Sequence, residues 1–128
     1  MIVDSSALVS ILLEEAGYEA LIEKLNHAEP VLVSAPSAVE AAIVLSSRIG
    51  RDARPMLAGL LSRMRAEIVD FTSQHYEAAV SAYLRFGKGR HPAGLNFGDC
   101  MSYALADESG LPLLYTGDDF SRTDVQSA

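Results

Sequence analysis

Acidic residues lie at several places where one apolar segment of the chain gives way to the next. They are Asp4 in Ile-Val-Asp-Ser-Ser, Glu40 in Ser-Ala-Val-Glu, Asp99 in Phe-Gly-Asp-Cys, and Asp118 and Asp119 in Thr-Gly-Asp-Asp-Phe. Carboxylates that converge on one place repel one another unless some stay protonated or a cation binds them. Ligand sets made only of oxygen favour Mg²⁺, with Mn²⁺ as a substitute. Such a site can activate water and stabilise displacement at a phosphodiester.

The acids can meet only if the elements that carry them share one edge of a sheet. Apolar runs at 1–3, 31–33, 68–71 and 113–116 predict four strands, and amphipathic patterns between them predict helices. Strands that are almost wholly apolar favour a parallel sheet covered on both faces. We therefore predict a single domain over residues 1–128, an α/β/α three-layer fold with a parallel central sheet of four or five strands.

This fold would place the acids at a common rim. Asp4 and Asp118 end predicted strands, whereas Glu40 and Asp99 lie early in predicted helices, the latter running from about 99 to 109. Right-handed crossovers bring the carboxyl ends of parallel strands to the same edge, where ligands of open α/β sheets bind. We therefore expect these carboxylates within a few ångströms of one another.

Each acid alone also has an ordinary structural explanation. Asp4 could cap the first helix, and Asp118 with Asp119 could be turn residues. Asp99 follows Asn96 at the spacing of a capping box, in which the two residues satisfy each other's backbone groups. The joint placement of the acids, rather than any single one, favours a cation site.

Composition excludes several classes of protein. Hydrophobic residues make up 49% of the chain, so a folded domain is expected, and the single cysteine, Cys100, excludes an internal disulfide. No apolar run approaches the roughly 20 residues that span a bilayer, and Asp4 interrupts the first one, so we predict a soluble, cytoplasmic protein with no membrane segment. The net charge of −7 argues against wholesale electrostatic capture of nucleic acid.

Basic residues nevertheless gather in one glycine-rich segment before Asp99. They are Arg85, Lys88, Arg90 and His91. The long loop that starts at Gly87 favours a functional role, and its bases could grip the phosphates of single-stranded or looped RNA. The alternative is an ordinary solvated surface loop.

Aromatic residues on the predicted helices are expected to pack the core. Tyr18, Tyr76, Tyr83 and Tyr103 occupy core-like positions of the helical patterns. Cys100 is expected to be a small buried hydrophobic residue, because no histidine partner for a nucleophile can be placed beside it.

In their order and spacing, the acidic motifs resemble those of PIN-domain ribonucleases and, more narrowly, the VapC toxins of bacterial type II toxin–antitoxin pairs. The resemblance covers the full length, and its most distinctive stretch is Phe-Gly-Lys-Gly-Arg-His-Pro-Ala-Gly-Leu-Asn-Phe-Gly-Asp. It implies Mg²⁺-dependent endonucleolytic cleavage of RNA. It also implies a cognate antitoxin whose carboxyl-terminal segment occupies the groove near the acids. A homodimer is expected.

The resemblance also assigns roles to individual residues. Asp4, Glu40 and Asp99 match the metal-binding acids of the family. Either Asp118 or Asp119 matches the fourth acid. The polar positions that steady the site by hydrogen bonds correspond to Ser6 and Thr116.

Two other functions are compatible with parts of the pattern. An acid-cluster hydrolase such as an aspartyl-phosphate phosphatase would need a second aspartate two residues after Asp4, where Ser6 stands. A non-catalytic module that binds a partner protein could use the same fold, although it would have no need for a complete set of acids.

Overall fold

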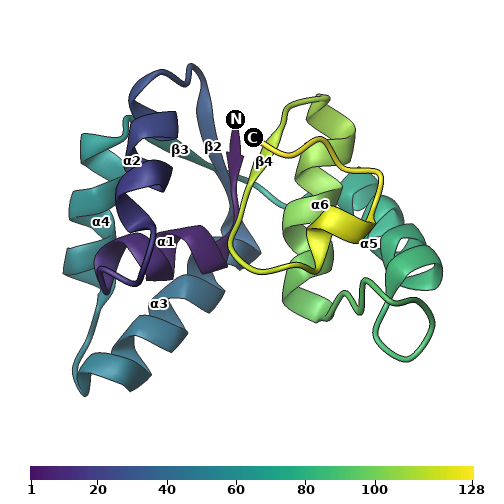
Figure 1. The fold of residues 1–128 in the computed structure, drawn as a ribbon, viewed down its shortest axis with the longest axis horizontal. Coiled ribbons are helices and arrows are strands. Elements are labelled where there is room, and N and C mark those ends of the chain that lie inside the picture. The colour runs from purple at the N-terminus through teal and green to yellow at the C-terminus, as the bar shows by residue number, and fades with distance from the viewer.

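Four short parallel strands form the central sheet in the computed structural model, which describes residues 1–128 (Figure 1). The strands are β1 (Ile2–Val3), β2 (Val31–Ser34), β3 (Ala66–Val69) and β4 (Leu113–Leu114). Their order is β3-β2-β1-β4, so the chain adds two strands on one side of β1 and the last strand on the other. A sheet that reverses its growth in this way opens a crevice at the carboxyl ends of the strands on either side of the reversal.

Helices cover both faces of this sheet, as Figure 1 shows. One layer contains α1 (Ser5–Leu12), α2 (Tyr18–Asn26), α3 (Ala35–Ile49) and α4 (Arg54–Arg63); the other contains α5 (Ser73–Phe86) and α6 (Phe97–Ser109). Side chains alternate across each strand. Val3 and Val33 pack with the first layer, whereas Ile2 and Leu113 pack with the second. The predicted three-layer α/β/α fold with a parallel sheet is confirmed.

The predicted elements differ from the observed ones mainly at their ends. The helix predicted from 99 begins two residues earlier, because the side chain of Asn96 caps α6 by accepting the Asp99 N–H. The third strand ends at Val69, so Phe71 lies outside it, and β4 stops at Leu114 instead of reaching Thr116.

The carboxyl-terminal tail forms backbone hydrogen bonds with the edge strand β4. Leu113 donates its backbone N–H to the carbonyl of Gln126 at 2.8 Å, and Ala128 donates to the carbonyl of Leu113 at 2.9 Å. An isolated parallel bridge pairs Leu113 with Ser127. The tail therefore lies beside β4, and the sheet itself has four strands, the lower of the two predicted numbers.

The prediction that all four helical tyrosines pack the core is wrong for two of them. Tyr103 is buried, but Tyr76 and Tyr83 of α5 are 59% and 43% exposed. Cys100 is buried, as expected. None of the helices combines the length and the apolar character that crossing a membrane requires.

Candidate active site

Asp4 is the buried centre of the candidate site. It follows β1 directly and caps α1, where its Oδ2 accepts the backbone N–H of Ser6 at 2.9 Å. The Ser6 hydroxyl donates to the same oxygen at 2.6 Å, and the Ser102 hydroxyl donates to Oδ1 at 2.6 Å. Only 2% of Asp4 is exposed, so these hydrogen bonds stand in for the water that the carboxylate loses.

Ser6 links the ends of the two strands that flank the crevice. Besides donating to Asp4, its hydroxyl accepts the backbone N–H of Thr116 at 3.1 Å, just beyond β4. The Asp4 N–H in turn donates to the carbonyl of Leu114 at 2.9 Å. Both predicted supporting residues thus lie at this rim, although Thr116 contributes its backbone and not its hydroxyl to the contact with Ser6.

Glu40 reaches the same region from the second turn of α3. Its Oε1 accepts a short hydrogen bond from the Ser5 hydroxyl in the first turn of α1. Its carboxylate also lies against Gly98 in the first turn of α6. Glu40 therefore bridges the starts of two helices that belong to opposite layers.

Asp99 occupies the third position of α6, where it completes a capping box. Its Oδ2 accepts the backbone N–H of Asn96 at 3.0 Å. Burial raises the pKa of the Asp99 carboxyl to about 6, the Asn96 N–H opposes that rise, and the negative charges of Asp4, Asp119 and Glu40 raise it further. The capping explanation therefore holds for Asp99, and the same side chain also experiences the charges of the other acids.

The two aspartates after β4 differ in their relation to the other acids. Asp119 adds to the rise in the pKa of Asp99, whereas Asp118 is not among the residues that do so. Asp118 accepts the Ser121 hydroxyl at its backbone carbonyl, 2.6 Å away, and its side chain is exposed. Both side chains are exposed, and of the two only Asp119 acts on the pKa of Asp99.

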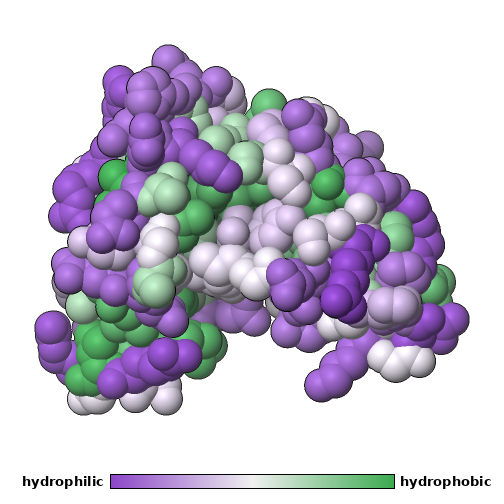
Figure 2. Space-filling model, in the orientation of Figure 1, coloured by the Kyte–Doolittle hydropathy of each residue, from purple (hydrophilic) through white to green (hydrophobic).

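The segments that carry the acids come together at one edge of the molecule. In Figure 1 the starts of α1 and α3, the start of α6 and the connection from β4 to η1 (Phe120–Arg122) come together at the lower middle of the view. Figure 2 shows the surface hollowed just below this place, between the two helical layers. This is the carboxyl edge of the sheet that the sequence predicts.

The tight cluster expected from the sequence is not formed. No three acidic, histidine or cysteine side chains are arranged so that they could hold a metal ion together. The charges of three acids nevertheless act on Asp99, because electrostatic coupling extends beyond ligand distances. All the donors are carboxylate or hydroxyl oxygens, a set that fits Mg²⁺ or Mn²⁺ and not a softer metal.

The four predicted RNA-binding residues do not form one free basic edge. Arg85 pairs with Asp124 at 2.6 Å and also donates to the Tyr103 hydroxyl at 3.4 Å, which ties α5 to the carboxyl-terminal tail. Arg90 donates to the carbonyl of Leu84, and His91 accepts the Ala93 N–H at Nδ1.

Lys88 is exposed, and its ammonium group makes no hydrogen bond within the chain. Arg85 is thus engaged in an ion pair, and its contact with phosphate stays a prediction. Lys88, Arg90 and His91 remain candidates.

Besides Ser6 and Thr116, the structure shows three supporting serines that the sequence analysis did not identify. Ser5 holds Glu40, Ser102 holds Asp4, and Ser37 contacts the Ser102 hydroxyl at 2.8 Å. For two of these serines the sequence contains a signal in their spacing. Ser37 lies one helical turn before Glu40, and Ser102 lies one turn after Asp99.

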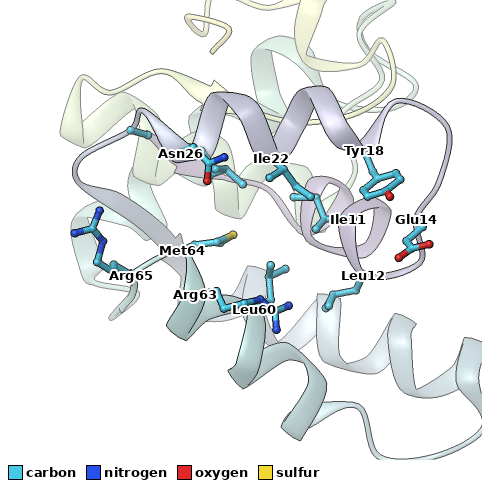
Figure 3. Close-up of a pocket in the computed structure, with 12 residues that line it drawn as sticks. Ile11, Leu12, Glu14, Tyr18, Ile22, Asn26, Leu60, Arg63, Met64 and Arg65 are labelled. Carbon is cyan, nitrogen blue, oxygen red and sulfur yellow. The ribbon is translucent and has the colours of Figure 1, made fainter.

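A separate apolar groove runs between α1, α2 and α4 (Figure 3). Ile11, Ile22 and Leu60 are among its apolar lining residues, and the charged residues that line it are Glu14, Arg63 and Arg65. None of the five predicted acids lines this groove, so it is a surface distinct from the acid site.

Known proteins match this chain over almost its whole length. The family model described as the PIN domain matches residues 1–126. "Ribonuclease VapC36" of Mycobacterium tuberculosis (strain H37Rv) is 43% identical over 127 residues, covering 98% of this chain and 91% of that protein. "Ribonuclease VapC" of Mycolicibacterium smegmatis is 47% identical over 126 residues, covering 98% and 97%.

Two solved structures share the fold. M. tuberculosis VapC20, described as a toxin that cleaves the sarcin–ricin loop, superimposes with a TM-score of 0.77 at 18% identity, covering 99% of this chain and 97% of that one. A toxin–antitoxin complex from Klebsiella pneumoniae gives a TM-score of 0.68 at 18% identity, covering 96% and 92%. At this level of identity the superpositions establish the fold alone.

Proposed function

Because this chain belongs to the PIN-domain family and, within it, to the VapC ribonucleases, we propose that it is an endoribonuclease and the toxin of a type II toxin–antitoxin pair. Relatives at 43% and 47% identity over almost the whole chain bear the name ribonuclease. The observation that carries the proposal is this similarity over almost the whole chain, together with the hydroxyl groups that hold Asp4 and Glu40 at the carboxyl edge of the sheet.

A divalent cation, Mg²⁺ or Mn²⁺, is the cofactor in this proposal. Asp4, Glu40, Asp99 and Asp119 are its proposed ligands, directly or through water. The chemistry that a bound cation supplies is neutralisation of these acids and polarisation of water and of the phosphodiester. Because burial and neighbouring charges disfavour the ionised form of Asp99, a cation would relieve a repulsion already present in the fold.

The protein supplies orientation and a place for the substrate. Ser6, Ser102 and the capping position together hold the Asp4 carboxylate fixed at the end of β1. The hollow beside it is open to solvent, and the segment with Lys88, Arg90 and His91 provides positive charge near the start of α6. We propose that this segment contacts RNA phosphates.

A phosphatase that forms an aspartyl-phosphate is a weaker explanation. Ser6, at the place where that chemistry would need a second aspartate, instead donates a hydrogen bond to Asp4. Asp4 accepts three hydrogen bonds, from the Ser6 N–H, the Ser6 hydroxyl and the Ser102 hydroxyl. These bonds fix the carboxylate as a ligand and leave it poorly suited to act as a nucleophile.

An antitoxin protein is the proposed regulatory partner. The apolar groove between α1, α2 and α4 offers a surface on which the apolar face of a partner helix could be buried (Figure 3). Arg63 and Arg65 would favour acidic side chains on that helix. Whether the partner also reaches the acids, as the family resemblance implies, is tested by whether its binding stops RNA cleavage.

A homodimer is the proposed assembly. The exposed face of α5 carries Tyr76, Val80, Tyr83 and Leu84, each between 43% and 59% exposed, and Phe97 at the start of α6 is 80% exposed. Apolar side chains gathered in this way favour burial against another protein surface. Sedimentation at micromolar concentration would give twice the monomer mass, and Val80→Glu would return it to the monomer mass.

Cleavage of RNA by the purified protein tests the proposed function. We expect endonucleolytic cuts that depend on added Mg²⁺ or Mn²⁺ and stop with a chelator. Asp4→Asn should lose cleavage by at least about a hundredfold, because Asn removes the charge and replaces one of the two accepting oxygens with an NH₂ group. Circular dichroism should show that the variant keeps the helical content of the wild type. Undiminished cleavage by Asp4→Asn would exclude the proposed site.

A further inference from the structure

Gly98 leaves a space that the carboxylate of Glu40 fills. A Cβ built on Gly98 would overlap Oε2 of Glu40 and would lie 2.6 Å from both Cδ and Oε1. The three nearest atoms to that Cβ all belong to the Glu40 carboxyl group, although Glu40 lies on α3 and Gly98 on α6. A side chain at position 98 and a carboxylate in its present place are therefore mutually exclusive.

Backbone conformation does not explain a glycine here. Gly98 is the second residue of α6 and is absent from the glycines with a left-handed backbone, such as Gly50 and Gly110. A glycine within a helix destabilises it by roughly 0.5–1 kcal/mol relative to alanine. The helix therefore gains no stability from glycine at position 98, and the structure shows one use of the missing side chain, which is the space taken by Glu40.

Glu40 is held from two sides at this place. The Ser5 hydroxyl donates to its Oε1 from α1, and the first turn of α6 lies on its other side. Backbone N–H groups at the start of a helix favour a negative charge. The neighbouring residue, Asp99, is one of the side chains whose pKa responds to the charge of Glu40.

We propose that Gly98 is a positioning residue for Glu40. The absence of a side chain at position 98 admits the Glu40 carboxylate to the first turn of α6 and so sets its distance from Asp99. This role rests on the proposed function, in which Glu40 and Asp99 belong to one cation site. Its effect is exerted entirely through Glu40, since Gly98 has no functional group of its own.

Replacement of Gly98 by alanine separates this role from a simple effect on the helix. Gly59 in α4 is the matched control, because a Cβ there meets only the Arg63 side chain, at 3.8 Å. Gly59→Ala should leave Mn²⁺ affinity and RNA cleavage unchanged. Gly98→Ala should lower the Mn²⁺ affinity of the metal-free protein, measured by calorimetry, by about tenfold, with a parallel loss of cleavage.

A double-mutant cycle identifies Glu40 as the residue through which Gly98 acts. We expect Glu40→Ala, which removes both the carboxylate and the overlap, to weaken Mn²⁺ binding, and addition of Gly98→Ala to that variant to cause no further loss. The same tenfold loss in the Glu40→Ala background would overturn the proposal, as would wild-type Mn²⁺ affinity in Gly98→Ala.

Folding of the variant is checked by its thermal unfolding. If Gly98→Ala is unstable, the double variant Gly98→Ala/Glu40→Ala should restore its Tm, because the overlap is removed. Instability that persists in the double variant also overturns the proposal.

Wild-type protein that neither binds Mn²⁺ nor cleaves RNA counts against the proposed function. Active wild-type protein with an equally active Gly98→Ala counts against the role of Gly98 alone.

Discussion

Ser102 of α6 donates a 2.6 Å hydrogen bond to Oδ1 of Asp4, a residue 98 positions earlier in the chain. The Ser102 hydroxyl also lies 2.8 Å from that of Ser37 on α3. Because the single hydroxyl hydrogen of Ser102 is directed to Asp4, Ser37 must donate to Ser102. All three side chains are almost fully buried, so this relay fixes Asp4 from beneath the site.

Ser102→Ala should destabilise the fold and weaken the site together. Loss of the hydroxyl leaves Oδ1 of the buried Asp4 without its donor, which costs about 1–3 kcal/mol in the free energy of unfolding. Ser37→Ala is the matched comparison, because it removes a hydroxyl from the same relay but leaves the bond to Asp4 intact. Urea unfolding should show the larger loss for Ser102→Ala, and equal losses would mean that the bond to Asp4 is not the important one.

Asp99 should make stability fall as pH rises. The pKa of its carboxyl group is about 6 in the folded protein, whereas the ordinary value for a free aspartate side chain is 3.8. Between these values the folded state binds more protons than the unfolded state, so the free energy of unfolding decreases as pH rises from about 4 to 7. After discounting for partial exposure, the effect is on the order of 1–2 kcal/mol.

Asp99→Asn tests this linkage in metal-free protein. Asn keeps an acceptor for the Asn96 N–H and removes the charge, so the variant should gain stability at pH 7 and little at pH 4. Asp107→Asn, on the exposed side of the same helix, controls for loss of one carboxylate from α6. An unchanged pH dependence in Asp99→Asn would show that burial and the neighbouring acids do not govern this carboxyl group.

The adjacent aspartates after β4 should differ in importance. Asp119→Asn should lower Mn²⁺ affinity and RNA cleavage by about ten- to a hundredfold, because Asp119 is the one whose charge reaches Asp99. Asp118→Asn should leave both nearly unchanged. Calorimetry with Mn²⁺ and a cleavage assay measure the two quantities, and the reverse order of effects would assign the fourth acid to Asp118.

The groove between α1, α2 and α4 should bind the antitoxin. Ile22 lines it and is 36% exposed, so Ile22→Glu should weaken antitoxin binding by at least about tenfold while leaving RNA cleavage by the free protein intact. Ile68→Glu, at a 48% exposed residue of β3 outside the groove, is the control. Equal affinity of both variants for the antitoxin would place its binding surface elsewhere.

The basic residues before Asp99 should separate into two classes. Replacement of Lys88 and Arg90 together by alanine should weaken RNA binding and reduce its dependence on salt concentration. Arg85→Ala should instead lower the Tm, since it breaks the ion pair with Asp124 that ties the tail to α5. Binding measured at several salt concentrations distinguishes the classes, and a stronger RNA defect in Arg85→Ala would contradict the assignment.

The layers and the rim of acids could be predicted from sequence because both follow from local patterns. Apolar strands alternate with amphipathic helices, and parallel topology then brings residues after β1 and β4 to one edge. The capping box of Asn96 and Asp99 was also visible as a spacing.

What could not be predicted depends on contacts between distant segments. The pairing of Arg85 with Asp124, the place of Ser102 beneath Asp4 and the fit of Glu40 against Gly98 are all set by how α3, α5 and α6 pack. The exposure of Tyr76 and Tyr83 has the same origin, because helical spacing identifies an apolar face but not whether a neighbour covers it.

Crystals of the wild-type protein soaked in Mn²⁺ offer the most direct measurement of the central claim. Anomalous scattering should give a Mn²⁺ peak at ligand distance from Asp4 and Asp99, with Glu40 and Asp119 bound directly or through water. Crystals of the Asp99→Asn variant, soaked in the same way, should show no such peak. A protein that cleaves RNA in Mn²⁺ yet shows its only ordered Mn²⁺ away from these acids would contradict the account.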